Sequence, residues 1–194
     1  KYSANDNFRP SGTHKVILSG DTLQKVSFAT AESYINQLEI RNTSSEGVSF
    51  ETKTYVVGEL YGTSTPIKNG RNLSLWEKTV INFDTWNNDL TIEGGSTLLK
   101  YLTVEGNLFV DHNLDLNGHT LTVLGDLIQS KGTLNINGGN LIVKKDYRIQ
   151  SKNVASSGAV SYGASSGLLK MTNEKDKVEV EGSFITQTSS NEDG

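Results

Sequence analysis

The sequence contains no cysteine and only 2 prolines among its 194 residues, and aromatic residues make up 8% of it. Without cysteine, a disulfide-held scaffold and a thiolate zinc site are both excluded. Lysine and arginine form no basic block and the net charge is −4, which argues against a nucleic-acid partner. No apolar run reaches the ~18 residues that a membrane-spanning helix needs. We therefore expect neither nucleic acid nor a membrane among the partners of this protein.

What the sequence does contain is a repeat of about twenty residues. The segment Leu114–Ser130 can be superposed without a gap on Leu134–Tyr147, and the second copy closes one residue later with Ile149–Ser151. A looser third copy runs from Leu169–Met171 through Val178–Ile185. A repeat of this length, built from short alternating segments, is typical of a β-solenoid.

Short runs with period-2 alternation recur along the whole chain, and each predicts a strand with one face in the core. They are Val16–Leu18, Val26–Phe28, Leu38–Ile40, Val48–Phe50, Leu90–Ile92, Leu102–Val104, Leu121–Val123 and Val178–Val180. The repeat predicts these inward positions: Leu116, Leu121, Val123, Leu127, Ile136, Leu141 and Val143. Helical spacing is nearly absent, and Ala29–Ile35 and Leu73–Val80 are the best candidates for a helical turn. The predicted fold class is all-β, with three strands and about twenty residues per turn.

We interpret residues 1–194 as one solenoid module. It has an irregular region at 52–88, regular rungs at 90–151, a loop at 153–167 inserted outward from the wall, and a last rung at 168–186. Both ends have the phase of an interior rung, and a solenoid end without a cap exposes apolar strands. We therefore expect the chain to be a piece of a longer protein, with neighbouring repeats among its partners.

The rung Leu-x-Leu-Asn-Gly-x-x-Leu-x-Val-x-Gly-x-Leu is matched in full at 114–127 and carries a family resemblance. At 134–147 it departs at Ile136, Lys145 and Tyr147. It resembles the right-handed parallel β-helix repeats of secreted and cell-surface bacterial proteins, including adhesin-like ones. Segments 11–20, 24–28 and 36–40 resemble a unit repeated in clostridial-type extracellular arrays. The resemblance implies a pectin-lyase-like fold and an extracellular or cell-surface location.

The function that this resemblance implies is non-catalytic: adhesion, polysaccharide binding or a rigid spacer. The partner would be a polysaccharide or a host or cell-wall surface glycan. The alternative is a lyase or hydrolase of the pectin-degrading type, which needs carboxylates with Ca²⁺ and a basic residue on one sheet face. Asp126, Asp146, Lys144 and Arg148 are the nearest set, and we map no catalytic residue of those enzymes onto the chain.

Three aromatic residues outside the regular rungs are the candidate ligand-binding residues: Trp76, Trp86 and Tyr162. Exposed aromatic rings stack on sugars and lose little entropy because they are rigid. The competing interpretation is that each tryptophan fills a widened part of the core.

Two sets of carboxylates are candidate calcium ligands, since Ca²⁺ prefers oxygen donors. Asp126 and Asp146 occupy the same position in successive rungs, and adjacent rungs lie about 4.8 Å apart. Two carboxylates this close repel each other, and a bound cation would offset that repulsion, as would the neighbouring Lys144 and Lys145. Asp84 and Asp89 flank Trp86 in a polar segment that otherwise forms a simple turn. No other cofactor is expected.

Two further patterns have structural explanations. Asn117 and Asn137 share a rung position before glycine, which predicts left-handed turns and an asparagine ladder along the axis. Gly163–Gly167 matches the G-x-S-x-G pattern with Ser165 as nucleophile. That pattern needs a strand before it and a helix after it, and this segment has neither.

Overall fold

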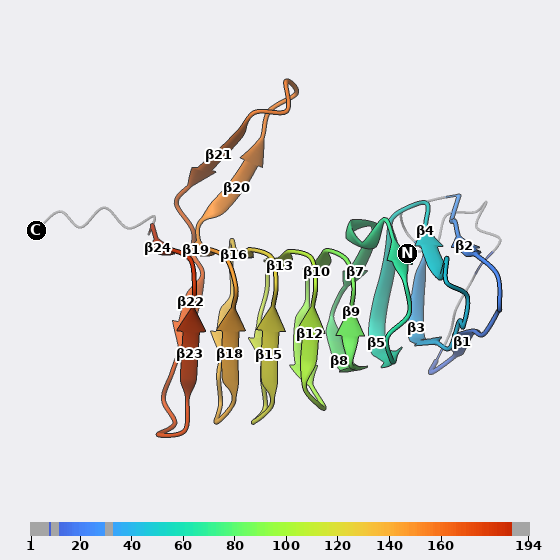
Figure 1. Cartoon of the computed structure of the whole chain (residues 1–194), viewed down its shortest axis with the longest axis horizontal. Helices are drawn as coiled ribbons and strands as arrows, with labels where there is room; N and C mark the ends of the chain where they lie inside the picture. Colours follow the sequence, from blue (N-terminus) through green and yellow to red (C-terminus); the bar gives the residue numbers. More distant parts are fainter. Residues whose placement is uncertain (1–7, 9–11, 30–32, 188–194) are drawn as a thin grey trace, which may run out of the picture.

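The structure, a computed structural model, describes residues 8, 12–29 and 33–187 and is a parallel β-solenoid of about 7 turns. Successive coils stack along one long axis (Figure 1). The described residues hold a single helical segment, the 3₁₀ turn η1 (Gly70–Asn72). None of those residues belongs to a helix with the length and hydropathy to cross a membrane. The predicted all-β solenoid with about twenty residues per turn is confirmed.

From residue 73 onward each coil contributes one short strand to each of three walls. The first wall contains β7 (Leu73–Leu75), β10 (Leu90–Ile92), β13 (Leu108–Val110), β16 (Leu127–Gln129), β19 (Tyr147–Ile149) and β24 (Phe184–Thr186). The second wall contains β8 (Lys78–Phe83), β11 (Gly95–Leu98), β14 (Leu114–Asp115), β17 (Thr133–Asn135) and β22 (Leu168–Lys170). The third wall contains β9 (Thr85–Trp86), β12 (Leu102–Val104), β15 (Thr120–Val123), β18 (Asn140–Val143) and β23 (Lys177–Val180).

The earlier coils differ from these. Each has one longer and one shorter strand, whereas the sequence predicted three strands per coil. The longer strands are β1 (Lys15–Leu18), β3 (Tyr34–Ile40) and β5 (Thr54–Gly62), and the shorter are β2 (Gln24–Val26), β4 (Val48–Phe50) and β6 (Ile67–Lys68). Thr54–Val56 pairs with β7, whereas Glu59–Gly62 pairs with β8. The continuous strand β5 therefore supports the first and second walls together.

The strand register agrees with the sequence repeat. Leu121 pairs with Leu141, which pairs in turn with Val178. Leu134 pairs with Leu114 on one side and Leu169 on the other. All seven residues predicted to point inward are fully buried: Leu116, Leu121, Val123, Leu127, Ile136, Leu141 and Val143. Because parallel strands stack in register, each inward side chain lies above its equivalent, and aliphatic columns fill the interior.

The helical prediction for Leu73–Val80 is wrong. After η1 this segment forms β7 and the start of β8, with Leu73 and Leu75 buried. The hydrophobic spacing there has period 2, which suits a strand. Of the other helical candidate, residues 30–32 lie outside the described residues, and Tyr34 and Ile35 begin β3.

The two Asn-Gly turns are confirmed, but the expected asparagine ladder is not. Asn117 and Asn137 have φ of 49° and 48°, and the glycines that follow are also left-handed. Each amide group finds a different partner: Asn117 Nδ2 donates to the carbonyl of Leu98 at 3.2 Å, and Asn137 Nδ2 donates to the Asp115 carboxylate at 3.0 Å. The side chains therefore tie coils together through other groups.

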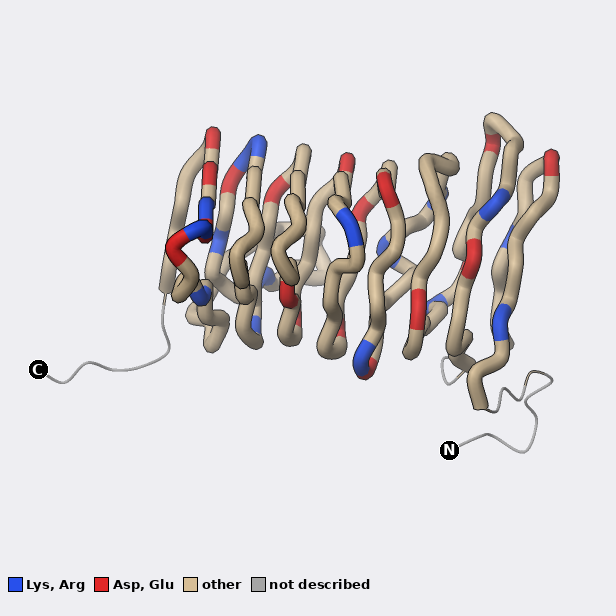
Figure 2. The backbone as a smooth tube through the Cα atoms, turned by 90° about the horizontal axis from the view of Figure 1, so that it is seen from below, with Lys and Arg blue, Asp and Glu red and all other residues tan. Residues whose placement is uncertain are grey.

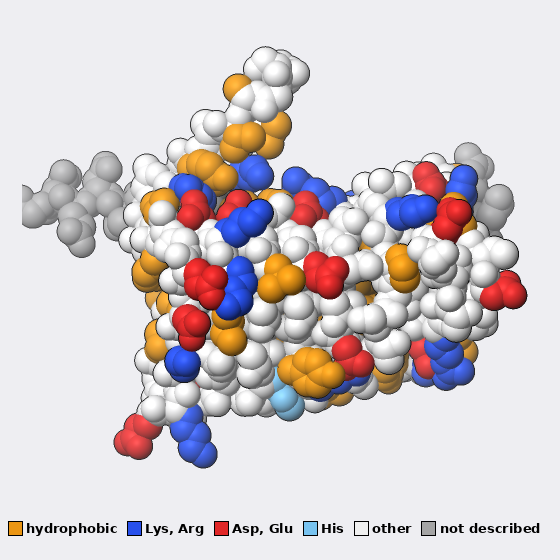
Figure 3. Space-filling view, viewed as in Figure 1, with side chains coloured by type: hydrophobic (Ala, Val, Ile, Leu, Met, Phe, Trp, Pro, Cys, Tyr) orange, Lys and Arg blue, Asp and Glu red, His pale blue; other side chains and the backbone are white. Residues whose placement is uncertain are grey.

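Between β19 and β22 an antiparallel hairpin leaves the wall, where the sequence predicted an inserted loop. Its strands are β20 (Ser151–Val154) and β21 (Val160–Gly163). The hairpin projects outward from the stack (Figure 1), and hydrophobic side chains lie along it (Figure 3). The coil pairing resumes beyond it, because Tyr147 still pairs with Phe184.

The surface is mixed in charge, and the last described coil is open. Both signs of charge are distributed along the coils without a block of one sign (Figure 2). Phe184 in β24 is 53% exposed, whereas Tyr147, its partner in the preceding coil, is fully buried. Leu168 in β22, the last described strand of the second wall, is 55% exposed. The final coil thus leaves apolar surface uncovered within the described residues.

Candidate functional site

The structure separates the two tryptophans. Trp76 lies at the corner between β7 and β8 and is 44% exposed, with its ring centroid 5.4 Å from that of Tyr55. Trp86 lies in β9 and is fully buried between Phe50 and Phe83. Its Nε1–H donates to the carbonyl of Asp89 at 2.8 Å. Trp86 therefore presents no ring face to a ligand, which corrects its selection as a surface stacking residue and agrees with the core-filling interpretation.

The register explains why Trp86 is inside. It pairs with Val104 on β12, and Val104 belongs to the fully buried column of the third wall. Farther along this column the smaller side chains of Val123 and Val143 are also fully buried. Thr85, its neighbour, stacks with Thr103 on the outer face.

The backbone of the corner holds Trp76 outward. Glu77, directly after it, has φ of 59°, a left-handed conformation that turns the chain sharply between two walls. The hydroxyl of Thr79 donates to the Trp76 carbonyl at 2.8 Å. In the next coil, Gly94 lies so close that a Cβ there would be 2.0 Å from the Glu77 nitrogen. Only glycine permits this close stacking of the two corners.

Trp76 forms part of the lining of a hollow of about 560 Å³ on this corner. Glu77, Glu93 and His112 share the lining, and they come from three successive coils. A second hollow of about 390 Å³ adjoins it along the second wall, since Lys78, Gly95 and Asn113 line both. We call the two hollows together the wall groove. It runs parallel to the solenoid axis, from Trp76 toward Lys170.

The floor of the wall groove is one outward column of the second wall. Its residues stack in register from coil to coil: Val80, Thr97, Asp115, Asn135 and Lys170. The Asp115 carboxylate accepts hydrogen bonds from the Asn117 N–H at 2.8 Å and from Asn135 Nδ2 at 3.2 Å. These hydrogen bonds fix the side chains of Asp115 and Asn135 in the floor of the groove.

Charge in the wall groove is partly compensated at the Trp76 end. Glu93 forms an ion pair of 2.7 Å with Lys53, whose ammonium also lies 5.4 Å from the centre of the Tyr55 ring. Burial, together with the Glu93 charge, raises the pKa of the Tyr55 phenol. Within the described part of the chain, no ion pair joins Lys78 or Lys170 to a carboxylate.

Tyr162 lies apart from this groove, on the projecting hairpin. The guanidinium carbon of Arg148 is 4.5 Å from the centre of its ring, a cation–π contact that fixes the base of the hairpin to β19. The hairpin follows β19, whereas Trp76 follows β7, four coils away in the stack (Figure 1). The structure thus does not bring the predicted aromatic residues together.

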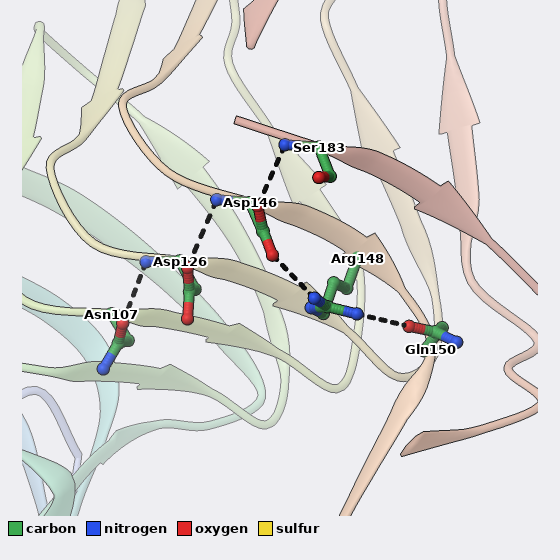
Figure 4. Close-up of polar contacts among 6 residues, drawn as sticks. All are labelled: Asn107, Asp126, Asp146, Arg148, Gln150 and Ser183. Atoms are coloured by element: carbon green, nitrogen blue, oxygen red, sulfur yellow. Dashed lines mark hydrogen bonds and ion pairs between the residues drawn. The ribbon is translucent and has the colours of Figure 1, made fainter. Parts of the chain in front are cut away.

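Asp126 and Asp146 do share a column, which extends to Asn107 and Ser183, and the side chains of this column bind the backbone of the next coil (Figure 4). Asn107 Oδ1 accepts from the Asp126 N–H at 2.8 Å, and Asp126 Oδ1 accepts from the Asp146 N–H at 3.2 Å. Asp146 Oδ1 accepts in turn from the Ser183 N–H at 2.9 Å. We call this series the carboxylate ladder. One oxygen of each aspartate is therefore already engaged within the wall.

The second oxygen of Asp146 is also engaged. Its Oδ2 lies 2.6 Å from Arg148 Nη2, and Arg148 Nη1 donates to Gln150 at 3.2 Å (Figure 4). The hydrogen bond from Ser183 and then the Arg148 guanidinium hold the pKa of Asp146 below its usual value. This carboxylate therefore stays ionised and structural through the physiological range.

Asp84 and Asp89 have separate partners. Asp84 lies 2.6 Å from Lys100 Nζ, and Asp89 Oδ1 accepts from the Asn107 N–H at 2.7 Å, which extends the ladder by one coil. Over residues 8, 12–29 and 33–187, no group of three or more His, Cys, Asp or Glu is arranged to hold a metal ion. Unfolding measured with and without Ca²⁺ tests the calcium hypothesis at these four aspartates directly.

The residues considered for lyase chemistry are engaged in contacts within the wall. Lys144 pairs with Glu181, and Arg148 pairs with Asp146. The candidate nucleophile Ser165 is also engaged. It is 5% exposed, and its hydroxyl lies within hydrogen-bond distance of the carbonyls of Gln129 and Ser130, at 2.9 and 2.8 Å. Its Oγ also accepts from the Gly167 N–H at 2.9 Å, so it fixes the end of the insertion. Because its hydroxyl is buried and hydrogen-bonded, Ser165 has a structural role here.

Sequence reasoning missed most of the groove: Lys78, Glu93, His112, Asn113, Asp115 and Lys170. They are distant in sequence and meet only through coil stacking. The aligned repeats do contain a signal, since Asp115 and Asn135 occupy equivalent outward positions. Comparisons with protein-family models, with curated proteins and with solved structures found no match to this chain. Its function has to be inferred from the geometry of its surfaces.

Proposed function

We propose that this protein is a non-catalytic glycan-binding module of a secreted or cell-surface protein, and that the wall groove holds the polysaccharide. The observation that carries the proposal is the exposed ring of Trp76 in the lining of an open hollow. A large rigid aromatic ring at 44% exposure leaves apolar surface in water, and a sugar ring stacked on it would remove that surface.

The shape and chemistry of the groove support a chain-like ligand. The groove extends along several coils, and polar side chains recur in its floor at the coil spacing of about 4.8 Å. Thr97 and Asn135 offer hydroxyl and amide groups for sugar hydroxyls. Because the groove is open, we expect weak binding to any one sugar and a gain in affinity with chain length.

The extracellular location is part of the same proposal. It is supported by the absence of cysteine, by the confirmed solenoid and by the resemblance of its rungs to bacterial surface repeats. A rigid stack of coils also suits a module that presents a binding surface at a distance from a cell.

Affinity gel electrophoresis tests the proposal. The protein is run through native gels that contain cell-wall or plant polysaccharides, and retardation is compared with a gel that lacks them. We expect Trp76→Ala to weaken retention about 2- to 10-fold, the equivalent of the ~0.5–1.5 kcal/mol that aromatic contacts contribute.

Tyr101→Ala is the matched control, because Tyr101 is also exposed, at 57%, but does not line the groove. Unchanged mobility of the wild type in every gel would favour a spacer role. Equal retention of wild type and Trp76→Ala would mean that the polysaccharide binds elsewhere than in the wall groove. Release of unsaturated products from pectin would replace the proposal with the lyase alternative.

A further inference from the structure

The hairpin β20–β21 has two chemically different faces. Side chains alternate between the faces of a strand, and directly paired residues share a face. Lys152 pairs with Tyr162 and Val154 pairs with Val160, so these four side chains form one face, which we call the valine face. The opposite face carries Ser151, Asn153, Ser161 and Gly163.

Among the residues that the structure describes, contacts from the wall cover the base of the valine face. There Tyr162 stacks on Arg148, and the Lys152 ammonium lies 5.5 Å from the centre of the Phe109 ring. Farther out, Val154 is 60% exposed and Val160 is 50% exposed. The hairpin extends beyond the wall at this point (Figures 1 and 3). Two adjacent valines are thus held in water on a projecting element.

Beyond Lys152 at its base, the hairpin also lacks the usual protection of an exposed strand edge. Natural edge strands carry lysines, prolines or bulges that block pairing with another chain. Residues 153–169 contain no charged residue and no proline, although charged residues make up 21% of the whole chain. A two-stranded ribbon is only marginally stable alone, so burial of its apolar face would stabilise it.

We propose that the hairpin is a self-association element, in which the valine face packs against the valine face of a second copy of this chain. The outer part of the valine face, Val154 and Val160, carries no charge, and the one charged residue of that face, Lys152, lies at its covered base over the Phe109 ring. This favours a second copy, since beside the two-fold axis of a symmetric contact each residue lies near its own equivalent and a charge would meet a like charge. The contact is small, so the dimer is weak and its population rises with protein concentration.

Sedimentation velocity over a wide range of protein concentrations tests this proposal. We expect the wild type to show a faster-sedimenting dimer that grows with concentration. Val160→Lys and Val160→Glu should each remove the dimer, because both place like charges in the contact. Ser161→Glu, on the opposite face of the hairpin, should leave it unchanged. Circular dichroism confirms that each variant retains its strand content.

A mixture of the two Val160 variants tests whether the valine face packs against the valine face of a second copy. We expect equimolar Val160→Lys and Val160→Glu to form a dimer again, because opposite charges then meet across the contact. A wild type that is monomeric at every concentration would overturn the proposal. So would a dimer that persists in both variants, or one that is lost in Phe184→Glu but not in the Val160 variants, since the open last coil would then be the interface. A dimer lost in each variant but not restored by mixing would also overturn it, because the valine faces would not meet each other.

Discussion

The carboxylate of Asp146 accepts a hydrogen bond from the backbone N–H of Ser183 at 2.9 Å, across 37 residues of sequence. In the two coils before it, the equivalent bonds span 19 and 20 residues. The carboxylate ladder therefore continues past the hairpin insertion and keeps the last coil in register. The hairpin insertion lies between Asp146 and Ser183 in the sequence, so this hydrogen bond helps to hold the last coil on the coil before it.

Two substitutions at Asp146 separate the roles of its hydrogen bond and its charge. Asp146→Ala removes the acceptor for Ser183 and should lower the free energy of unfolding by about 1 kcal/mol, a value reduced for solvent exposure. Asp146→Asn keeps an acceptor oxygen, as Asn107 does in the same column, and should cost less. Thermal unfolding at neutral pH measures both. Equal losses for Ala and Asn would mean that the Arg148 ion pair matters more than the ladder.

The pH dependence of the Asp146 effect follows from the lowered pKa. A carboxylate with a lower pKa in the folded state stabilises the fold above its unfolded pKa, about 3.9, and loses this effect as pH falls through the folded value. The stability difference between wild type and Asp146→Asn should therefore be constant near neutral pH and shrink below about pH 4. Unfolding curves over that range measure it. A difference that grows in acid would contradict the assignment.

Val123→Asp should unfold the protein. Val123 is fully buried and lies between Val104 and Val143 in a core column, so an aspartate there would be an unpaired buried charge that costs several kcal/mol. Thr122→Asp is the control, since Thr122 is on the outer face of the same strand and should cost at most about 1 kcal/mol. Circular dichroism and solubility are the readouts. A folded, soluble Val123→Asp protein would refute the register.

Trp86→Ala should destabilise the fold by roughly 3–5 kcal/mol, the range for large aromatic deletions in a core. Trp76→Ala should cost less, because the side chain of Trp76 is 44% exposed and contacts Tyr55 at the surface. Trp86→Phe keeps most of the packing but removes the Nε1–H donor to Asp89, so an intermediate loss is expected. Chemical denaturation of the three variants measures these values. A stable Trp86→Ala protein with weakened glycan retention would return Trp86 to the binding surface.

The regular walls could be predicted because each coil repeats the same inward positions. Leu121, Leu141 and Val178 are adjacent in space, and the alignment of the repeats places them in one column. Trp86 could have been assigned to the core by the same reasoning, since Thr85-Trp86 aligns with Thr103-Val104. The early coils lack a repeated motif, so nothing local indicated that β5 would extend along two walls.

The candidate site was less predictable, because stacking and not sequence proximity assembles it. Trp76 and His112 line one hollow although a whole coil lies between theirs. The exposure of Trp76 depends on the left-handed corner at Glu77, a conformation that glutamate rarely adopts. The hairpin did leave a signal, since Val154 and Val160 flank a Ser-Ser-Gly turn, but the serine-rich composition favoured a loop.

The last prediction concerns metal. We expect removal of divalent cations with a chelator to leave the melting temperature unchanged, because Asp126 and Asp146 already accept backbone hydrogen bonds and Asp84 is paired with Lys100. Calorimetry with and without chelator, followed by added Ca²⁺, measures the effect. A ligand that binds only the folded state raises its stability by mass action, so a fall in melting temperature that Ca²⁺ reverses would establish a calcium site. Repeating the scan with Asp84→Asn and with Asp126→Asn would then assign it, since only the variant that lacks a ligand should lose its response to Ca²⁺.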